Sequence, residues 1–270
     1  MEIQPDEIKE TVKERYSELA RQQQTISCCG SDEKQACCGP NALYSREQLT
    51  GIPDGIADSS LGCGDPTAIA DLKPGEVVLD LGCGGGLDCF LAARRVGKAG
   101  KVIGLDMTSD MIDLASDNAR KMGATNVEFR LGEMEQMPVD NESVDAIISN
   151  CVINLSPDKD AVFREAFRVL KPGGRLAISD KALLAELPEV LQDNPDAWSC
   201  CIAGAINKDD YLAKIKAAGF TDLTAEEEKT PLFVELGCGC GEDDCAGSTA
   251  ERLDLSNTVI NLRVRARKPG

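Results

Sequence analysis

The sequence predicts a doubly wound α/β fold, in which helices cover both faces of a mostly parallel sheet. Short apolar runs alternate with segments of helical periodicity from about residue 77 to residue 183. A glycine-rich turn follows the first apolar run, and the second run ends in an acidic residue. With 270 residues, of which 42% are hydrophobic, the chain is long enough to bury a substantial core.

The amino-terminal region, residues 1–62, is expected to hold one helix and a cysteine-rich loop. Ile8, Val12 and Tyr16 recur at helical spacing within residues 5–24, which predicts an amphipathic helix that packs on a larger body. The following segment, SCCGSDEKQACCGP, repeats a CCG doublet and is rich in turn residues. It is therefore expected to be a loop that can close over a ligand.

Residues 63–183 are expected to form the central α/β domain. Asp65 predicts a helix N-cap, with Pro66 at the first helical position. Further helices are expected over residues 87–96, 109–122 and 158–170. The strands are expected at VVLDLG, KVIGLD, NVEFRLG, VDAIISN and GRLAISD.

Residues 184–270 are expected to form a smaller α+β domain. The pattern indicates a helix over residues 207–218 and a final strand, TVINLRVRARK. Between them, the stretch PLFVELGCGCGEDDC is rich in turn residues and carries Cys238, Cys240 and Cys245. These cysteines could bind a soft metal ion or capture another soft, thiol-binding ligand, or they could belong to a loop without a binding role.

Charge and hydropathy exclude several classes of partner. The net charge of -17, from 46 acidic and 29 basic residues, would repel nucleic acid and anionic lipid. No segment approaches the roughly 18 apolar residues of a membrane span, and the polar start does not resemble a signal peptide. A cytoplasmic protein is expected, in which the 13 cysteines stay reduced. Because the chain has no histidine, its chemistry should need no imidazole.

The turn in VVLDLGCGGGLD is a candidate cofactor site. Asp80 ends the strand, and Gly82, Gly84 and Gly86 let the backbone pass close to a ligand. Such a turn alone could serve NAD, FAD or S-adenosylmethionine. Asp106, at the end of KVIGLD, can accept hydrogen bonds from ribose hydroxyls.

These motifs, with LGEMEQMP and RVLKPGGRLAISD, resemble the class I methyltransferases, which bind S-adenosylmethionine on a Rossmann-like sheet. The resemblance implies that Asp80 and Gly82 lie at the methionine end of the cofactor, Asp106 and Met107 at the ribose, and Glu133 and Met134 at the adenine. Two further candidates are Asp88, which either orients the cofactor or caps a helix, and Asn150 at a strand end.

Three cysteines in separate contexts are expected to converge on one acceptor site. Cys151 follows the strand VDAIISN and therefore lies at the carboxyl edge of the sheet, where such folds bind ligands. Cys63 precedes the helix that leads into the first strand, and Cys201 follows the fifth strand. Cys200 is either a spare ligand or a packing residue, whereas Cys83 and Cys89 are expected to be packing residues.

Three thiolates fit trivalent arsenic as the methyl acceptor. Soft sulfur ligands select soft acceptors, and three of them satisfy the valence of arsenic while leaving it one lone pair. That lone pair carries no proton, so its attack on a sulfonium methyl group needs no general base. Holding arsenic beside the methyl group would lower the barrier by proximity and alignment.

The chain from about Tyr16 to Phe220 is similar to the arsenite methyltransferases in LGCG, in GLDC, in SNCVINL and in the cysteine before a small-residue run. This resemblance implies that Cys63, Cys151 and Cys201 bind arsenic and that Cys28 or Cys29 is the fourth, amino-terminal cysteine of the family. It also implies transient pairing of that cysteine with Cys63, a glutathione or thioredoxin reductant, and a role in arsenic detoxification.

Two other functions are compatible with parts of the sequence. A methyltransferase of the same fold that acts on a quinone or another small organic acceptor would explain the cofactor motifs but not the cysteines. A non-catalytic protein that binds arsenite or a soft metal would explain the cysteines but not Asp80, Asp106 and LGEMEQMP together.

Overall fold

The computed structural model describes residues 4–22, 43–57, 62, 64–192, 194–236 and 251–270. Its main feature is a seven-stranded sheet with the strand order β3-β2-β1-β4-β5-β9-β6. Strands β1 to β5 are parallel, and β9 is antiparallel to both β5 and β6. The strands are β1 (Val77–Leu81), β2 (Lys101–Asp106), β3 (Val127–Leu131), β4 (Val144–Asn150), β5 (Leu170–Leu183), β6 (Thr221–Glu228) and β9 (Val259–Arg267).

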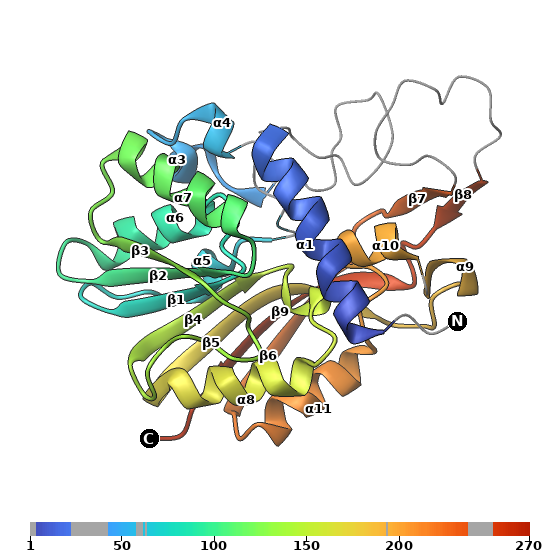
Figure 1. Ribbon diagram of the computed structural model, residues 1–270. Helices are drawn as coiled ribbons and strands as arrows, with labels where there is room; N and C mark the ends of the chain where they lie inside the picture. Colours follow the sequence, from blue (N-terminus) through green and yellow to red (C-terminus); the bar gives the residue numbers. More distant parts are fainter. Residues whose placement is uncertain (1–3, 23–42, 58–61, 63, 193, 237–250) are drawn as a thin grey trace.

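Helices cover both faces of this sheet, which confirms the predicted doubly wound fold (Figure 1). The long helices, α6 (Leu87–Val96), α7 (Ser109–Met122), α8 (Lys159–Val169) and α11 (Lys208–Ala217), lie where the periodicity predicts them. Each face has its own core. Cys89 and Ala92 of α6 pack on one face, whereas Phe163 of α8 and Tyr211 of α11 pack on the other.

Short helices connect the main elements. Asp65 caps α5 as predicted, because its side chain accepts a hydrogen bond from the backbone N–H of Ala68 at 3.0 Å. The other short helices were not predicted, because three to five residues are too few to show a period. The short helices are α3 (Arg46–Leu49), α4 (Asp54–Ala57), α5 (Pro66–Ile69), η1 (Ile153–Leu155), α9 (Glu189–Gln192) and α10 (Pro195–Ser199).

Part of the carboxy-terminal region, residues 184–270, extends the main sheet. Strand β9 inserts between β5 and β6, and Val259, Ile260 and Leu262 become part of the buried core. The remainder forms a smaller layer, in which α9, α10 and a ribbon of β7 (Phe233–Leu236) and β8 (Glu251–Asp254) surround a separate apolar cluster. The sequence analysis placed β7 inside a turn-rich stretch and missed β8.

Helix α1 (Pro5–Gln22) confirms the helix expected over residues 5–24, and it lies between α7 and α10 (Figure 1). Lys9 Nζ lies 2.7 Å from Glu133 Oε2 and 3.1 Å from Glu135 Oε1. Val12, about one turn further along the helix, is fully buried. The helix is thus held by ion pairs at its edge and by apolar packing beneath it.

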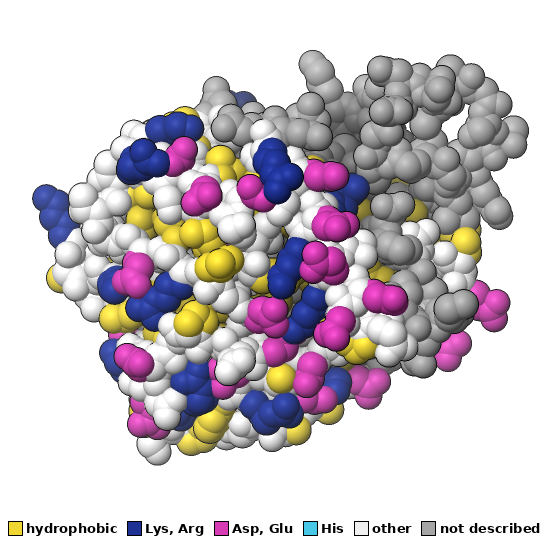
Figure 2. All heavy atoms as spheres, viewed as in Figure 1, with side chains coloured by type: hydrophobic (Ala, Val, Ile, Leu, Met, Phe, Trp, Pro, Cys, Tyr) yellow, Lys and Arg dark blue, Asp and Glu magenta, His cyan; other side chains and the backbone are white. Residues whose placement is uncertain are grey.

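Acidic and basic side chains are interspersed over the face shown in Figure 2. Among the helices that the structure describes, none combines the length and hydropathy needed to cross a bilayer.

Candidate functional site

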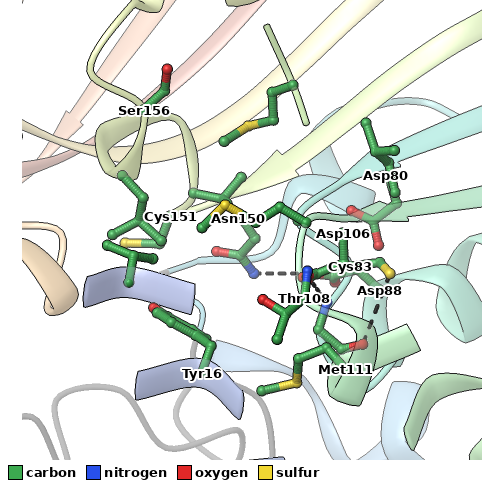
Figure 3. A pocket seen from close by; sticks show the side chains of 18 of the residues that line it. Tyr16, Asp80, Cys83, Asp88, Asp106, Thr108, Met111, Asn150, Cys151 and Ser156 are labelled. Atoms are coloured by element: carbon green, nitrogen blue, oxygen red, sulfur yellow. Dashed lines mark hydrogen bonds between the residues drawn. The ribbon is translucent and has the colours of Figure 1, made fainter. Parts of the chain in front are cut away.

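A pocket opens at the carboxyl ends of β1, β2 and β4, beneath α1. Its empty volume, open mouth included, is about 1020 Å³, which is enough for a nucleoside-sized ligand. Figure 3 shows Cys151, Asn150 and Tyr16 around the same cavity as three aspartates. Of the residues predicted to form the site, those that line the pocket are Asp80, Gly82, Gly84, Asp88, Asp106, Met107, Met134, Asn150 and Cys151.

The glycine turn forms the floor of this pocket. Gly82, Gly84 and Gly86 have φ angles of 62°, 49° and 91°, which are the left-handed values that favour glycine. A Cβ at Gly82 would lie 2.2 Å from Val152 Cγ2, whereas one at Gly84 would meet no atom within 4 Å. Gly86 does not line the pocket but precedes the first residue of α6. The glycines therefore serve two purposes, close packing and open access to the backbone.

Three buried aspartates lie together in the pocket wall. Burial raises the pKa of Asp80 well above its usual range, and the nearby charge of Asp88 raises it further. Burial also raises the pKa of Asp106, although its carboxylate accepts backbone hydrogen bonds from Gly84 at 3.0 Å and Thr108 at 2.9 Å. A cationic ligand would relieve the cost of burying these carboxylates together.

Asp88 is connected to Tyr44 and Asn150 by hydrogen bonds. The Tyr44 hydroxyl donates to Asp88 Oδ1 at 2.9 Å, and Asn150 Nδ2 donates to Asp88 Oδ2 at 3.0 Å. Burial raises the pKa of Asp88 to about 7, although both hydrogen bonds favour its charged form. Asp88 is therefore part of the pocket wall and does more than begin a helix.

Replacement of Asp88 by asparagine is expected to stabilise the ligand-free protein above pH 7. Between the usual pKa of 3.8 and the folded pKa of about 7, the folded protein holds a proton that the unfolded chain releases. Stability therefore falls as pH rises through this window, and the variant escapes this loss. Thermal unfolding should give a variant Tm a few degrees higher at pH 8 and no difference near pH 4. A Tm difference between the variant and the parent that does not change with pH would contradict the raised pKa of Asp88.

Glu133 does not line the pocket, although its neighbours Gly132 and Met134 do. Its carboxylate instead binds Lys9 at 2.7 Å and Lys13 at 3.3 Å, and the Lys9 ammonium lowers the pKa of Glu133. The predicted contact of Glu133 with an adenine stays a prediction. In the structure, the ion pairs of Glu133 with Lys9 and Lys13 hold α1 over the pocket.

Cys151 and Cys201 lie together under α1. The Cys201 thiol donates a hydrogen bond to the Cys151 carbonyl oxygen, and both side chains pack against Ile8, Val12 and Leu155. Both cysteines have positive φ angles, 59° and 60°, which are rare for residues other than glycine. Strain of this kind persists where the surrounding structure imposes it, often at functional sites. Cys151 also lines the pocket, so the cysteine pair borders it.

Cys63 lies outside the described residues, but both of its neighbours are described. A Cβ at Gly62 would lie 2.2 Å from Asn150 Nδ2, and Gly64 exchanges two hydrogen bonds with the Asn150 side chain, at 2.7 and 3.2 Å. Gly62 and Gly64 thus both contact Asn150, the residue before Cys151. Also outside the described residues are Cys28, Cys29, Cys238, Cys240 and Cys245.

Other cysteines pack in apolar surroundings, as expected. Cys89 is fully buried and donates to Asp80 Oδ2 at 3.1 Å, and burial raises its pKa. Cys83 lines the pocket but also belongs to the core between α6 and the sheet. Cys200 faces the carboxy-terminal layer rather than the cysteine pair. Within the described part of the chain, no three cysteine or carboxylate side chains gather in a group that could hold a metal ion.

Several residues of the site were not predicted from sequence. Val12 and Tyr16 line the pocket, and the Tyr16 hydroxyl donates to the Ser199 carbonyl at 3.2 Å. Trp198 packs against the cysteine pair, with the Lys159 ammonium 5.9 Å from its ring centroid. Burial lowers the pKa of Lys159 to about 8. The helical stripe identified Val12 and Tyr16 as packing residues but could not show what they cover.

Comparisons with known proteins identify one family. A family model described as a methyltransferase domain matches residues 72–219. The chain is 42% identical to an arsenite methyltransferase of Halobacterium salinarum, with 98% of this chain and 68% of that protein aligned. It is 37% identical to an arsenite methyltransferase of Aquipseudomonas alcaligenes over 72% of this chain, but spans only 58% of that protein.

A solved structure supports the same relationship. The crystal structure of an arsenic(III) S-adenosylmethionine methyltransferase from Chlamydomonas reinhardtii matches with a TM-score of 0.64 and 33% sequence identity. The match covers 83% of this chain and 73% of that protein. The fold and the sequence therefore point to the same group of proteins.

Proposed function

The chain belongs to the S-adenosylmethionine-dependent arsenite methyltransferases, and from this premise we propose that Cys63, Cys151 and Cys201 hold trivalent arsenic for methylation. One observation carries the assignment of these residues. Cys151 lines the pocket formed by the glycine turn and the aspartates, and Cys201 packs against it. The products are methylated arsenicals, and the activity serves arsenic detoxification.

The described pocket suits the cofactor, which supplies a methyl group on a cationic sulfonium and also carries an ammonium group. Asp80 and Asp88 would hold the cationic end, because a positive charge would stabilise the ionised form of two carboxyl groups whose pKa values burial raises. Asp106 and Met107 would hold the ribose, and Met134 would contact the adenine. Gly82 and Gly84 leave their backbone open to the ligand.

Arsenic binds by exchange of oxygen for sulfur. Arsenous acid loses its three hydroxyl groups with the three thiol protons as water, and three arsenic–sulfur bonds form. Cys151 and Cys201 are about 5% and 4% exposed, so the bound arsenic would be shielded from solvent. Val12 and Leu155 cover the cysteine pair with apolar surface, which keeps competing water away from the reacting atoms.

Methyl transfer needs no proton acceptor in this site. The lone pair of arsenic forms the new arsenic–carbon bond, and the electrons of the broken carbon–sulfur bond stay on the departing sulfur. The residues of the chain therefore act by alignment and by charge rather than by moving protons. This agrees with a sequence that contains no histidine.

The transfer raises the formal oxidation state of arsenic by two, so a return to the trivalent state takes two electrons. We propose that an external thiol, glutathione or thioredoxin, supplies them, and that Cys28 or Cys29 pairs transiently with Cys63 on this route. Support comes from the family resemblance and from the cysteine-rich composition of residues 27–38.

The proposal is tested by following a labelled methyl group. The full chain is incubated with arsenite, glutathione and S-adenosylmethionine carrying a ¹³C methyl, and arsenic species are separated and identified by mass spectrometry. Methylated arsenic that carries the label is expected. If the protein binds the cofactor but labels only an added quinone, it is an organic-substrate methyltransferase. If it binds arsenite and transfers no methyl group to any acceptor, it is a thiol-binding protein.

A further inference from the structure

The side-chain amide of Asn150 is shared among more acceptors than it has hydrogens. Its Nδ2 lies 2.7 Å from the Gly64 carbonyl oxygen, 2.9 Å from the Tyr44 hydroxyl and 3.0 Å from Asp88 Oδ2. An amide nitrogen carries two hydrogens, so these three acceptors compete for two bonds. The backbone N–H of Gly64 donates to Asn150 Oδ1 at 3.2 Å, which fixes the orientation of the amide.

The three competing acceptors belong to different parts of the site. Asp88 lines the cofactor pocket, whereas Gly64 is the residue after Cys63. Tyr44 follows the cysteine-rich segment and is almost fully buried. Asn150 itself precedes Cys151. One amide group therefore contacts the cofactor pocket and also the chain next to two of the proposed arsenic ligands.

A cation bound beside Asp88 would change this competition. The Asp88 carboxylate now depends on the Tyr44 hydroxyl and on Asn150 for its hydrogen bonds. A positively charged ligand group would replace Asn150 as a partner of Asp88. The two amide hydrogens would then be free for the Gly64 carbonyl oxygen and the Tyr44 hydroxyl. The segment next to Cys63 would be held more firmly while the cofactor pocket is occupied.

We propose that Asn150 and Tyr44 are positioning residues that couple the cofactor pocket to the acceptor cysteines, so that a bound cofactor raises the affinity for arsenite. The inference rests on the proposed function, because it takes Cys63 and Cys151 as arsenic ligands. Coupling between two sites is reciprocal, so arsenite raises the affinity for the cofactor by the same factor.

The test measures arsenite binding with and without a cofactor analogue. Trp198 is the single tryptophan of the chain and packs against Cys151 and Cys201, so its fluorescence reports on this site. S-adenosylhomocysteine keeps the ammonium group but has no methyl group to transfer. Saturation with it should tighten arsenite binding by at least about fivefold. A Cys151→Ser variant should show no such arsenite response, which identifies the signal.

Two matched tyrosine substitutions test the route of this coupling. Tyr44→Phe leaves two acceptors for the two hydrogens of the Asn150 amide, so occupation of the cofactor pocket no longer changes the competition. The ratio of the arsenite affinity with S-adenosylhomocysteine to that without it should therefore fall to about one. Tyr211→Phe is the control. It also removes a buried hydroxyl that donates to a carboxylate, Asp180 Oδ2 at 3.1 Å, but outside the amide network. Tyr211→Phe should therefore keep the same ratio of arsenite affinities, with and without S-adenosylhomocysteine, as the parent.

The outcomes separate this inference from the proposed function. A ratio of one in the parent, or an unchanged ratio in Tyr44→Phe, would overturn the coupling, while the labelled-methyl experiment would still decide the activity. If arsenite caused no Trp198 response in the parent, arsenite would not bind beside Trp198 and this inference would fail, while the labelled-methyl experiment would still decide the activity. Thermal unfolding of both tyrosine variants verifies that each is folded at the assay temperature.

Discussion

Serine at position 151 should reduce arsenic methylation by at least about 100-fold, because hydroxyl oxygen is a hard, weakly acidic ligand that does not replace thiolate toward arsenic. The affinity for S-adenosylhomocysteine should stay within about twofold, because the substitution keeps the shape of the side chain. Initial rates, measured by mass spectrometry, and calorimetric titration with S-adenosylhomocysteine give the two quantities.

The neighbouring pair Cys200 and Cys201 provides a matched control for this prediction. Cys201 packs with Cys151 under α1, whereas Cys200 packs with the carboxy-terminal layer. Cys201→Ser should therefore resemble Cys151→Ser, and Cys200→Ser should retain most of the activity. If Cys200→Ser lost as much activity as Cys201→Ser, the assignment of these two neighbouring cysteines would be wrong.

Alanine at position 80 should weaken cofactor binding by about 100-fold, equivalent to almost 3 kcal/mol, because a buried carboxylate that binds a cation is lost. The substitution should not lower the stability of the ligand-free protein. Burial and the charge of Asp88 already raise the pKa of Asp80, so its removal relieves an unfavourable charge. Calorimetric titration with S-adenosylhomocysteine and thermal unfolding separate the two effects.

An aspartate outside the pocket is the comparison for this variant. Asp117 lies on α7 with its side chain about half exposed, and it does not line the pocket. Asp117→Ala should leave the cofactor affinity unchanged. Unchanged binding in Asp80→Ala would show that the cofactor lies elsewhere, and a large loss of stability would show that Asp80 mainly supports the fold.

Much of the fold could be predicted from the sequence because buried parallel strands form short apolar runs. VVLDL and KVIGLD stand out from the polar segments around them, and the helices between them have a clear period. Strand β9 was predicted as a strand but not as part of the main sheet. Its partner, β5, ends 76 residues earlier at Leu183, and no local pattern reports a pairing across that distance.

The site could be predicted where a residue lies at the end of a strand or in a turn. Asp80 and Asp106 lie at the ends of apolar strands and Cys151 follows one, and the edge of the sheet brings them together. Tyr44 had no such signal, because it is a single aromatic residue in a polar segment and its partners are Asp88 and Asn150. Contacts of this kind depend on tertiary packing, which period and motif do not encode.

The central claim is that thiolates of the chain hold arsenic beside the cofactor pocket. X-ray absorption at the arsenic edge tests it most directly, with one equivalent of arsenite bound to the full chain in the presence of S-adenosylhomocysteine. A first shell of three sulfur atoms and no oxygen is predicted for the parent, with one sulfur lost in Cys151→Ser and one in Cys201→Ser. Three sulfur neighbours that persist unchanged in both variants would show that other cysteines bind the arsenic, and the acceptor site described above would be wrong.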